Sequence, residues 1–230
     1  MGEAPSRVPA LTALGGLVLA IASGLLAMQE LGPPLAIATS PAGQFQAFAS
    51  GEARLPVAEA SRADLIGECY KLTRTLLARA QPTERRLRLL EACRTLALDT
   101  VAAAPTVGLA WTVAAAYSGE LGDVAGFNQQ LRQSWRGAPH EQWIAELRVA
   151  LTEQYFASAD TDIRGQEVSD LAILVQSQRG IKSLAKRYVD DLAFRERVTA
   201  VVETLPPADQ VRFLHEVQAA ARAEARPDVG

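Results

Sequence analysis

Histidine would most readily indicate metal or acid–base chemistry, and the sequence contains only two, His140 and His215. Neither has a cysteine, another histidine or a carboxylate at the spacing that a zinc site needs. The motifs of phosphate-binding loops, dinucleotide-binding folds, serine hydrolases and zinc peptidases do not occur in the sequence either. We therefore expect no catalytic residue, no cofactor and no metal site.

Carboxylate pairs are the next candidates, because glycoside hydrolysis needs two acidic groups that face one pocket. Asp190 and Asp191 are adjacent and point in different directions on a helix, and Asp160 and Asp162 fall in a loop. We interpret both pairs as solvated surface charge.

Cys69 and Cys93 are the only cysteines, and the helices expected around them decide what they can do. Ser61 is suited to cap a helix, and the turn at Pro82 and Thr83 opens a second one. Apolar residues recur at helical spacing in both segments, at Leu65, Cys69, Leu72 and Leu76 and then at Leu87, Leu90, Cys93, Leu96 and Ala97. A turn this short makes the two helices antiparallel.

The midpoint between positions 69 and 93 is the turn itself, so the two cysteines should lie at the same height on facing helices. In an oxidising compartment they could form a disulfide that closes a loop of about 24 residues and contributes about 3 kcal/mol in the chain-entropy model. The alternative is two reduced cysteines in the core, where a thiol behaves as a small apolar group.

Composition favours an all-α fold, because alanine and leucine dominate over branched and aromatic residues. The net charge of -3 offers no basic surface of the kind that nucleic-acid-binding domains carry. We expect no nucleic-acid partner.

The chain carries no charged residue from Val8 to Gln29. At about 1.5 Å per residue this stretch reaches roughly 33 Å as a helix, enough for a bilayer core of about 30 Å. The sequence predicts a membrane anchor of one transmembrane helix in residues 1–31. The alternative is a cleavable signal peptide, since Arg7 precedes the apolar run and Ala36 to Ala38 resemble a cleavage site.

Few charges bear on orientation: Arg7 stands before the apolar run, and no Lys or Arg follows it until Arg54. The positive-inside rule predicts a cytoplasmic N-terminus and an exported domain. Gly16, Ala20 and Gly24 form a transmembrane packing stripe that would let a second helix approach, although small residues are common in such helices anyway.

Residues 32–60 contain four prolines and little periodicity, which predicts a flexible linker. The helical domain is expected at 61–225 and a disordered tail at 226–230. In the last third we expect helices at Gln166–Gln178, at Ile181 to about Leu205, and from Pro207 to about Ala225.

The stretch from Leu109 to Pro139 resembles a tetratricopeptide repeat (TPR), a helical hairpin of 34 residues. The matching residues are Trp111, Ala115, Gly122, Asp123, Leu131, Ser134 and Pro139. Two positions depart from the pattern, because Phe127 replaces the usual alanine and the aromatic residue comes one place early, as Tyr117. Pro105 lies 34 residues before Pro139, so the hairpin around the cysteines would be an upstream repeat. The resemblance implies a TPR-like helical-hairpin array.

Tryptophans and basic clusters are the remaining binding candidates. Trp111 is expected in the core, whereas Trp135 and Trp143 form a possible ligand groove. Basic residues gather at Arg85, Arg86 and Arg88 and at Arg179, Lys182, Lys186 and Arg187; they could bind an acidic polysaccharide or an anionic membrane, or simply be solvated.

The N-terminal span, the linker, the run from Ala102 to Leu151 and the phrase "YVDDLAFRERVTAVVETLPPADQVRFL" resemble degenerate TPR-like, membrane-anchored accessory proteins of alphaproteobacterial polysaccharide gene clusters. The resemblance covers roughly residues 60–215 and implies a non-enzymatic adaptor or scaffold for cell-envelope polysaccharide assembly or export. The expected location is the bacterial inner membrane, with a single pass and a periplasmic domain. The expected partner is an integral membrane or periplasmic protein of that assembly.

Two other functions stay open at this point. One is a periplasmic carbohydrate-active enzyme, and the other is a cytosolic-facing helical regulator.

Overall fold

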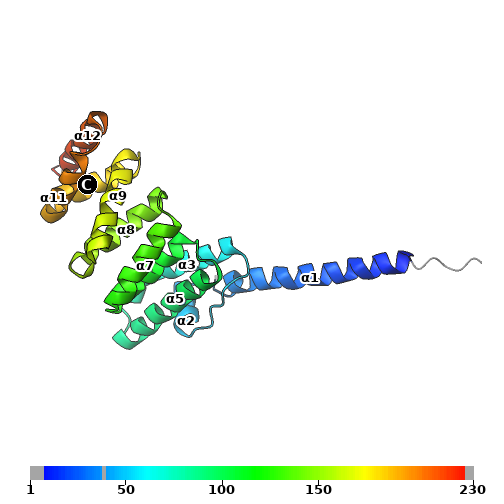
Figure 1. The fold of residues 1–230 in the computed structure, drawn as a ribbon. Helices are drawn as coiled ribbons and strands as arrows, with labels where there is room; N and C mark the ends of the chain where they lie inside the picture. The colour runs from blue at the N-terminus through cyan, green and yellow to red at the C-terminus, as the bar shows by residue number, and fades with distance from the viewer. Residues whose placement is uncertain (1–7, 38–39, 226–230) are drawn as a thin grey trace, which may run out of the picture. The chain divides into compact units, whose positions relative to one another are not determined.

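The computed structural model describes residues 8–37 and 40–225, and in the first helix it describes the surroundings of residues 14–28 only. All regular structure in these ranges is helical (Figure 1), so the expected all-α fold is confirmed. In chain order the elements are α1 (Val8–Ile37), α2 (Pro41–Ala49), α3 (Glu59–Thr73), α4 (Leu76–Arg79), α5 (Thr83–Ala103), α6 (Gly108–Glu120), α7 (Val124–Gly137), α8 (Gln142–Gln154), the 3-10 turn η1 (Phe156–Ser158), α9 (Thr161–Gln176), α10 (Gly180–Asp190), α11 (Leu192–Val202) and α12 (Pro207–Glu224).

The chain forms two compact units, Met1–Asp99 and Thr100–Gly230. Unit 1 holds α1 to α4 and most of α5, and unit 2 holds α6 to α12. The helical segment expected at 61–225 is thus divided within α5. The tail expected at 226–230 lies outside the described residues.

Helix α1 continues through Ile37, past Pro33 and Pro34, and so extends beyond the boundary expected at residue 31. Proline has a helix-compatible φ and loses only its own amide donor, which allows a helix to accommodate it at some cost. In the part of the chain that the structure describes, no helix meets the length and hydropathy of a membrane-spanning segment. Residues 1–7 of the expected anchor, and the surroundings of 8–13 and 29–31, lie outside that part.

The flexible linker expected at 32–60 is corrected by helix α2. Ser40 caps this helix by accepting a hydrogen bond from the Gly43 amide at 3.0 Å, and Pro41 follows at the first helical position. Phe45 and Phe48, three residues apart, are both buried. The segment is therefore docked through two aromatic side chains, which outweighs its content of proline.

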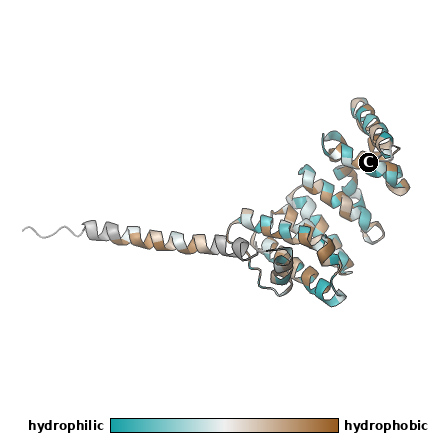
Figure 2. Ribbon diagram, turned by 180° about the vertical axis from the view of Figure 1, so that it is seen from behind, coloured by the Kyte–Doolittle hydropathy of each residue, from teal (hydrophilic) through white to brown (hydrophobic). Residues whose placement is uncertain are grey.

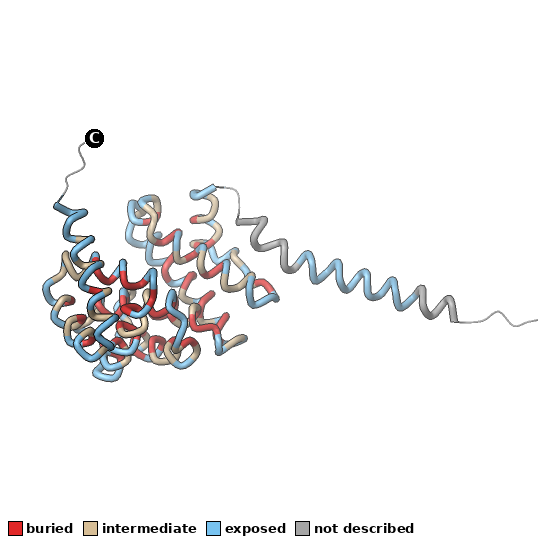
Figure 3. The backbone as a smooth tube through the Cα atoms, turned by 90° about the horizontal axis from the view of Figure 1, so that it is seen from above, coloured by how far each residue is buried: buried red, intermediate tan, exposed pale blue. Residues whose placement is uncertain are grey.

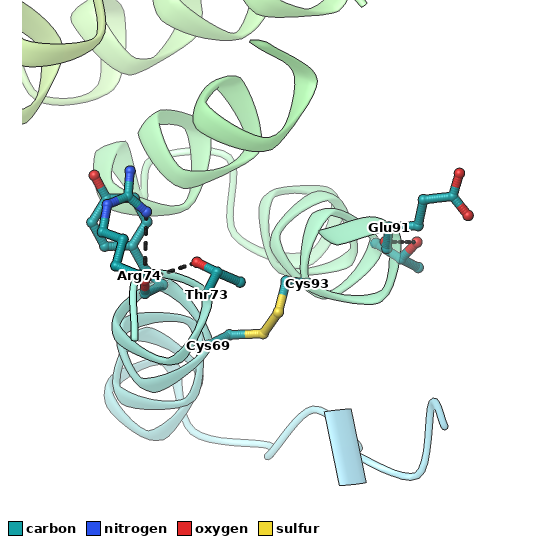
Figure 4. The surroundings of a disulfide bond; sticks show 7 residues. Cys69, Thr73, Arg74, Glu91 and Cys93 are labelled. Carbon is teal, nitrogen blue, oxygen red and sulfur yellow. Dashed lines mark hydrogen bonds between the residues drawn. A yellow bond between two sulfur atoms is a disulfide. The ribbon is translucent and has the colours of Figure 1, made fainter. Parts of the chain in front are cut away.

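Helices α3 and α5 are joined by the disulfide between Cys69 and Cys93, whose Cα atoms are 5.9 Å apart (Figure 4). Both cysteines are buried, as the facing-helix argument requires. The start of α3 is corrected: it begins at Glu59 with Ala58 at the N-cap, so Ser61 lies inside the helix.

The first apolar set is corrected at Leu76, whose side chain is 84% exposed. The chain turns after Thr73, and the Thr75 hydroxyl accepts the Ala78 amide to begin the short helix α4. This turn rotates Leu76 away from the face that Leu65 and Leu72 occupy.

Helices α6 and α7 form the hairpin that the Gly-Asp turn predicts. Gly122 has a φ of +77°, which an L side chain rarely adopts, and the Asp123 carboxylate accepts the Gly126 amide at 2.9 Å to cap α7. Nearly every residue of α6 from Thr112 to Ser118 is buried, because small alanines let neighbouring helices approach on several sides.

The core of unit 2 continues through α8 to α12 around one apolar cluster. It contains Ala145, Val149, Leu171, Leu174, Val175, Ile181, Leu184, Phe194, Val198, Val201 and Phe213. In Figure 2 most helices of this unit carry both polar and apolar colours, and in Figure 3 buried residues follow one side of them. This amphipathic pattern is what a helical array needs to bury a continuous seam.

The single helix expected from Ile181 to about Leu205 is corrected to two helices, α10 and α11. The break falls at Asp191, whose carboxylate accepts the Phe194 amide at 3.0 Å and caps α11. Leu192 consequently points to solvent instead of joining the apolar face that includes Leu184.

Reduction of the disulfide should destabilise unit 1. We expect Cys69→Ser with Cys93→Ser, or reduction of the wild-type chain, to lower the free energy of unfolding of this unit by about 3 kcal/mol. Denaturant unfolding followed by circular dichroism with and without reductant measures the change. The double variant must not respond to reductant; an equal response in both chains would contradict the assignment.

The turn at Gly122 should not tolerate a side chain. We expect Gly122→Ala to destabilise unit 2 by about 1 kcal/mol, because the added Cβ strains the left-handed backbone. Gly165→Ala is the matched control: Gly165 lies within α9 with open space around its Cα, so alanine there should stabilise by about 0.5 kcal/mol. Thermal unfolding of the wild type and the two variants should show a lower melting temperature for Gly122→Ala and a higher one for Gly165→Ala.

Candidate functional site

A surface pocket lies between the start of α8 and the turn from α9 to α10. Its volume is about 190 Å³, and its lining residues are Gln142, Trp143, Glu146, Leu174, Ser177, Arg179 and Gly180. Trp143 is the second residue of α8, and 47% of its surface remains exposed. A large aromatic side chain left half in solvent beside a pocket is a common feature of binding sites.

The far wall of this pocket is fixed by a tight turn at Ser177. Its hydroxyl accepts the Gly180 amide at 2.7 Å and donates to the Leu174 carbonyl at 3.1 Å. A Cβ at Gly180 would lie 2.5 Å from the Ser177 hydroxyl and 2.7 Å from Leu174 Cδ2. Glycine is thus required for close approach here, and the turn holds Arg179 at the edge of the pocket.

The pocket carries one charge of each sign. Arg179 Nε lies 3.9 Å from the Glu146 carboxylate, and the Arg179 side chain is 86% exposed. An ion pair this long and this exposed contributes little to stability. Both charged groups therefore remain available to a ligand.

Trp135 does not share this pocket, so the groove expected from Trp135 and Trp143 is not formed by both residues. Trp135 borders a small interior cavity together with Arg148, Glu167 and Asp170. Its indole Nε1 is buried and has no hydrogen-bond partner within the described residues.

Each nitrogen of the buried Arg148 guanidinium donates a hydrogen bond inside the protein. The group donates to both oxygens of Asp170, at 2.7 and 2.6 Å, and to the Ala138 carbonyl at 3.0 Å. Both side chains of the ion pair are 3% exposed. Burial raises the pKa of the Asp170 carboxyl, and the hydrogen bonds from Arg148 oppose that rise. This pair joins α8 to α9 and to the end of α7.

Glu153 and Glu167 form a buried carboxyl pair that the sequence analysis missed. Arg197 and Arg187 both bind Glu153, the former through Nε at 2.7 Å and the latter at 3.4 Å. Burial, together with the negative charge and hydrogen bond of Glu153, raises the pKa of Glu167 to about 8, whereas Arg197 and Arg187 lower it. Glu167 is therefore protonated at neutral pH.

The location of this pair bears on whether it could hydrolyse a glycan. The Glu153 side chain is 1% exposed, and the cavity beside Glu167 has a volume of about 10 Å³, room for about one water molecule. A sugar ring cannot enter such a space. We interpret the two glutamates as structural.

Three of the four carboxylates considered from the sequence have structural roles. Arg132 on α7 binds both Asp160 and Asp162, at the start of α9. Its hydrogen bond lowers the pKa of the Asp162 carboxyl. Asp191 caps α11, and Asp190 is exposed at the end of α10.

The residues of the repeat signature lie in one hairpin. Ala115, Leu131 and Ser134 are buried between α6 and its neighbours, and Pro139 follows the end of α7. The Ser134 hydroxyl hydrogen-bonds the Thr112 hydroxyl at 2.6 Å, which joins the two helices. Trp111 is only half-buried, and its Nε1 donates to the Pro105 carbonyl at 2.8 Å.

One departure from the repeat pattern, Phe127, packs against an aromatic residue at the end of α8. Phe127 is buried and meets the Tyr155 ring edge-on, with centroids 5.3 Å apart. A Cβ at Gly119 would lie 2.7 Å from the Tyr155 ring, so this glycine makes room for it. Phe127 is thus accommodated by an edge-on contact with Tyr155, for which Gly119 leaves room.

Among the residues that the structure describes, none packs against the small-residue stripe on α1. A Cβ at Gly16 or Gly24 would meet nothing within 4 Å, and Ala20 is exposed. The exposed state of this helix is visible in Figure 3.

No protein-family model, curated protein or solved structure matches this chain.

The raised pKa of Glu167 predicts a pH-dependent stability. The unfolded chain releases this proton near pH 4.5 and the folded chain only near pH 8, so the free energy of unfolding should fall as pH rises between these values. Glu167→Gln keeps the side chain neutral and should be more stable than wild type above pH 8, by about 1 kcal/mol or more. Urea unfolding of both chains at pH 5 to 9 measures how the free energy of unfolding depends on pH.

The control is Glu196→Gln, a neutralisation of an exposed glutamate on α11. It should follow the wild-type profile. A Glu167→Gln profile parallel to wild type would mean that the wild-type carboxyl is already ionised.

Proposed function

We propose that this protein is a non-enzymatic adaptor, anchored in the bacterial inner membrane by its N-terminal helix. Its helical domain lies in the periplasm and supports assembly or export of a cell-envelope polysaccharide by binding other components. Its partner is an integral membrane or periplasmic protein of that assembly.

The observation that carries the proposal is the apolar surface of α1. Every described residue of this helix is exposed, and its large apolar side chains are more than half exposed: Leu14, Leu17, Val18, Leu19, Ile21, Leu25, Leu26 and Met28. A soluble surface rarely presents so continuous an apolar stretch, so a lipid or protein environment must cover it. The uncharged stretch from Val8 to Gln29 favours lipid.

The disulfide supports export of the domain. Structural disulfides persist in oxidising compartments such as the bacterial periplasm and are rare in the cytosol. The Cys69–Cys93 bond joins two helices that follow α1 in the chain, on the side that the positive-inside rule predicts to be exported.

Two features support binding as the mode of action. The α6–α7 hairpin is of the kind that stacks into repeat arrays, whose surfaces commonly bind peptides or other ligands. The pocket at Trp143 offers an aromatic side chain and both signs of charge at the surface. The polysaccharide setting rests on the resemblance to accessory proteins of polysaccharide gene clusters.

Site-directed labelling tests the topology in cells. Ser183→Cys introduces a free thiol on the exposed side of α10, while the native cysteines stay paired. In intact spheroplasts this thiol should react with a membrane-impermeant maleimide. Ser6→Cys, before the apolar stretch, is the matched variant and should react only after lysis.

The reverse labelling pattern would mean that the domain faces the cytosol and would favour a helical regulator. Release of the full chain by an alkaline carbonate wash would instead remove the membrane anchor from the proposal. Either result contradicts the function as proposed.

A further inference from the structure

The Trp143 pocket has the features of a site for a ring-shaped, hydroxyl-rich ligand. One wall is the exposed indole of Trp143, and the polar side chains of Gln142, Glu146 and Arg179 border it. An aromatic face binds the apolar face of a flat ring, and neighbouring polar groups fix its orientation. The volume of about 190 Å³ suits one small ring and not a helix.

The charges around the pocket select an acidic ligand. Arg179 is almost fully exposed, and Lys182 follows it one helical turn later on α10, also exposed. Arginine pairs well with carboxylates because its planar donors match both oxygens. Asp190 raises the pKa of the Glu224 carboxyl and Lys186, one turn further along α10, opposes that rise, so part of the Lys186 charge is offset.

Glu146 distinguishes a sugar from an acidic peptide. Its carboxylate lies 3.9 Å from Arg179 Nε, so a ligand must satisfy an anion and a cation within the width of one ring. The carboxylate of any ligand is attracted by Arg179 and repelled by Glu146, and a glutamate or aspartate side chain carries no donor that would offset this repulsion. A uronate ring supplies a carboxylate for Arg179 and hydroxyl donors for Glu146 in the same unit.

We propose that the Trp143 pocket binds one uronate unit of an acidic polysaccharide, with the sugar stacked on Trp143, its carboxylate on Arg179 and Lys182, and its hydroxyls on Glu146 and Gln142. This inference rests on the proposed function, because it names the ligand that the adaptor would hold. The remainder of the polysaccharide extends into solvent along α10.

Calorimetric titration of the full chain in mild detergent tests the site. The probes are hexamers of galacturonate and of guluronate, with maltohexaose as the neutral sugar and hexaglutamate as the acidic peptide. A uronate hexamer should bind most tightly, and raised salt should weaken it because ionic contacts are screened.

The variants separate stacking from charge. Trp143→Ala should weaken uronate binding about tenfold or more, while Trp143→Phe should retain most of it. Arg179→Ala should weaken uronate binding about tenfold and remove the preference over maltohexaose. Arg54→Ala, at an exposed arginine in the loop after α2, is the control and should bind as wild type does.

Three outcomes would overturn the inference: no binding of either uronate, hexaglutamate binding as tight as the uronates, or unchanged binding by Trp143→Ala. Circular dichroism verifies that each variant folds, which the exposure of Trp143 and Arg179 leads us to expect. The labelling in spheroplasts does not depend on any sugar, so failure of this inference and failure of the proposed function are distinguishable.

Discussion

The second unit depends on the burial of one guanidinium group. Arg148 lies in the interior, where an unpaired charge would cost several kcal/mol, and it is stable there because Asp170 and the Ala138 carbonyl accept its hydrogen bonds. These partners belong to α9 and to the residue after α7, so satisfying one side chain fixes the relative position of three helices. A core of leucine and alanine alone would resist small slips between these helices less strongly, because apolar contact is not directional.

The same constraint positions the surface pocket. Trp143 lies a little over one turn before Arg148 on α8, and the turn at Ser177 lies two turns after Asp170 along α9 and its C-terminus. The ion pair holds these two helices side by side and so helps to set the width of the pocket between their ends. The hydrogen bonds of Ser177 and the long ion pair between Arg179 and Glu146 complete its walls.

The hairpin of α6 and α7 could be predicted from the sequence because its signals are local. Gly122 and Asp123 determine the turn through their own backbone and side chain, and the apolar spacing defines the buried faces. Two errors involved local signals that were not used: Ser40 before Pro41 marks the cap of α2, and Asp191 can cap a helix at position 192. The proline content of residues 32–60 instead indicated a linker, and the apolar spacing across residue 191 indicated one continuous helix.

The candidate site was beyond prediction for a different reason. The sequence offers Trp143 as a candidate binding residue, yet Glu146 and Arg179 stand 33 residues apart and meet only through the packing of α8 against α9. Arg148 and Asp170, or Glu153 and Arg197, are likewise separated by helices, and no spacing rule connects them. Pairings of this kind depend on tertiary structure, whereas periodicity reports only which face of each helix is buried.

Both cysteines of the chain, Cys69 and Cys93, belong to the first of the two units, and the second unit contains no cysteine. During synthesis Cys93 therefore emerges before any residue of the second unit, and its only possible intramolecular partner, Cys69, has already been made. The crosslink can close at that stage without choosing among alternatives. Two cysteines can form only one bridge within one molecule, so no mispaired bridge has to be corrected. Oxidation of this chain therefore requires an oxidant but no isomerase.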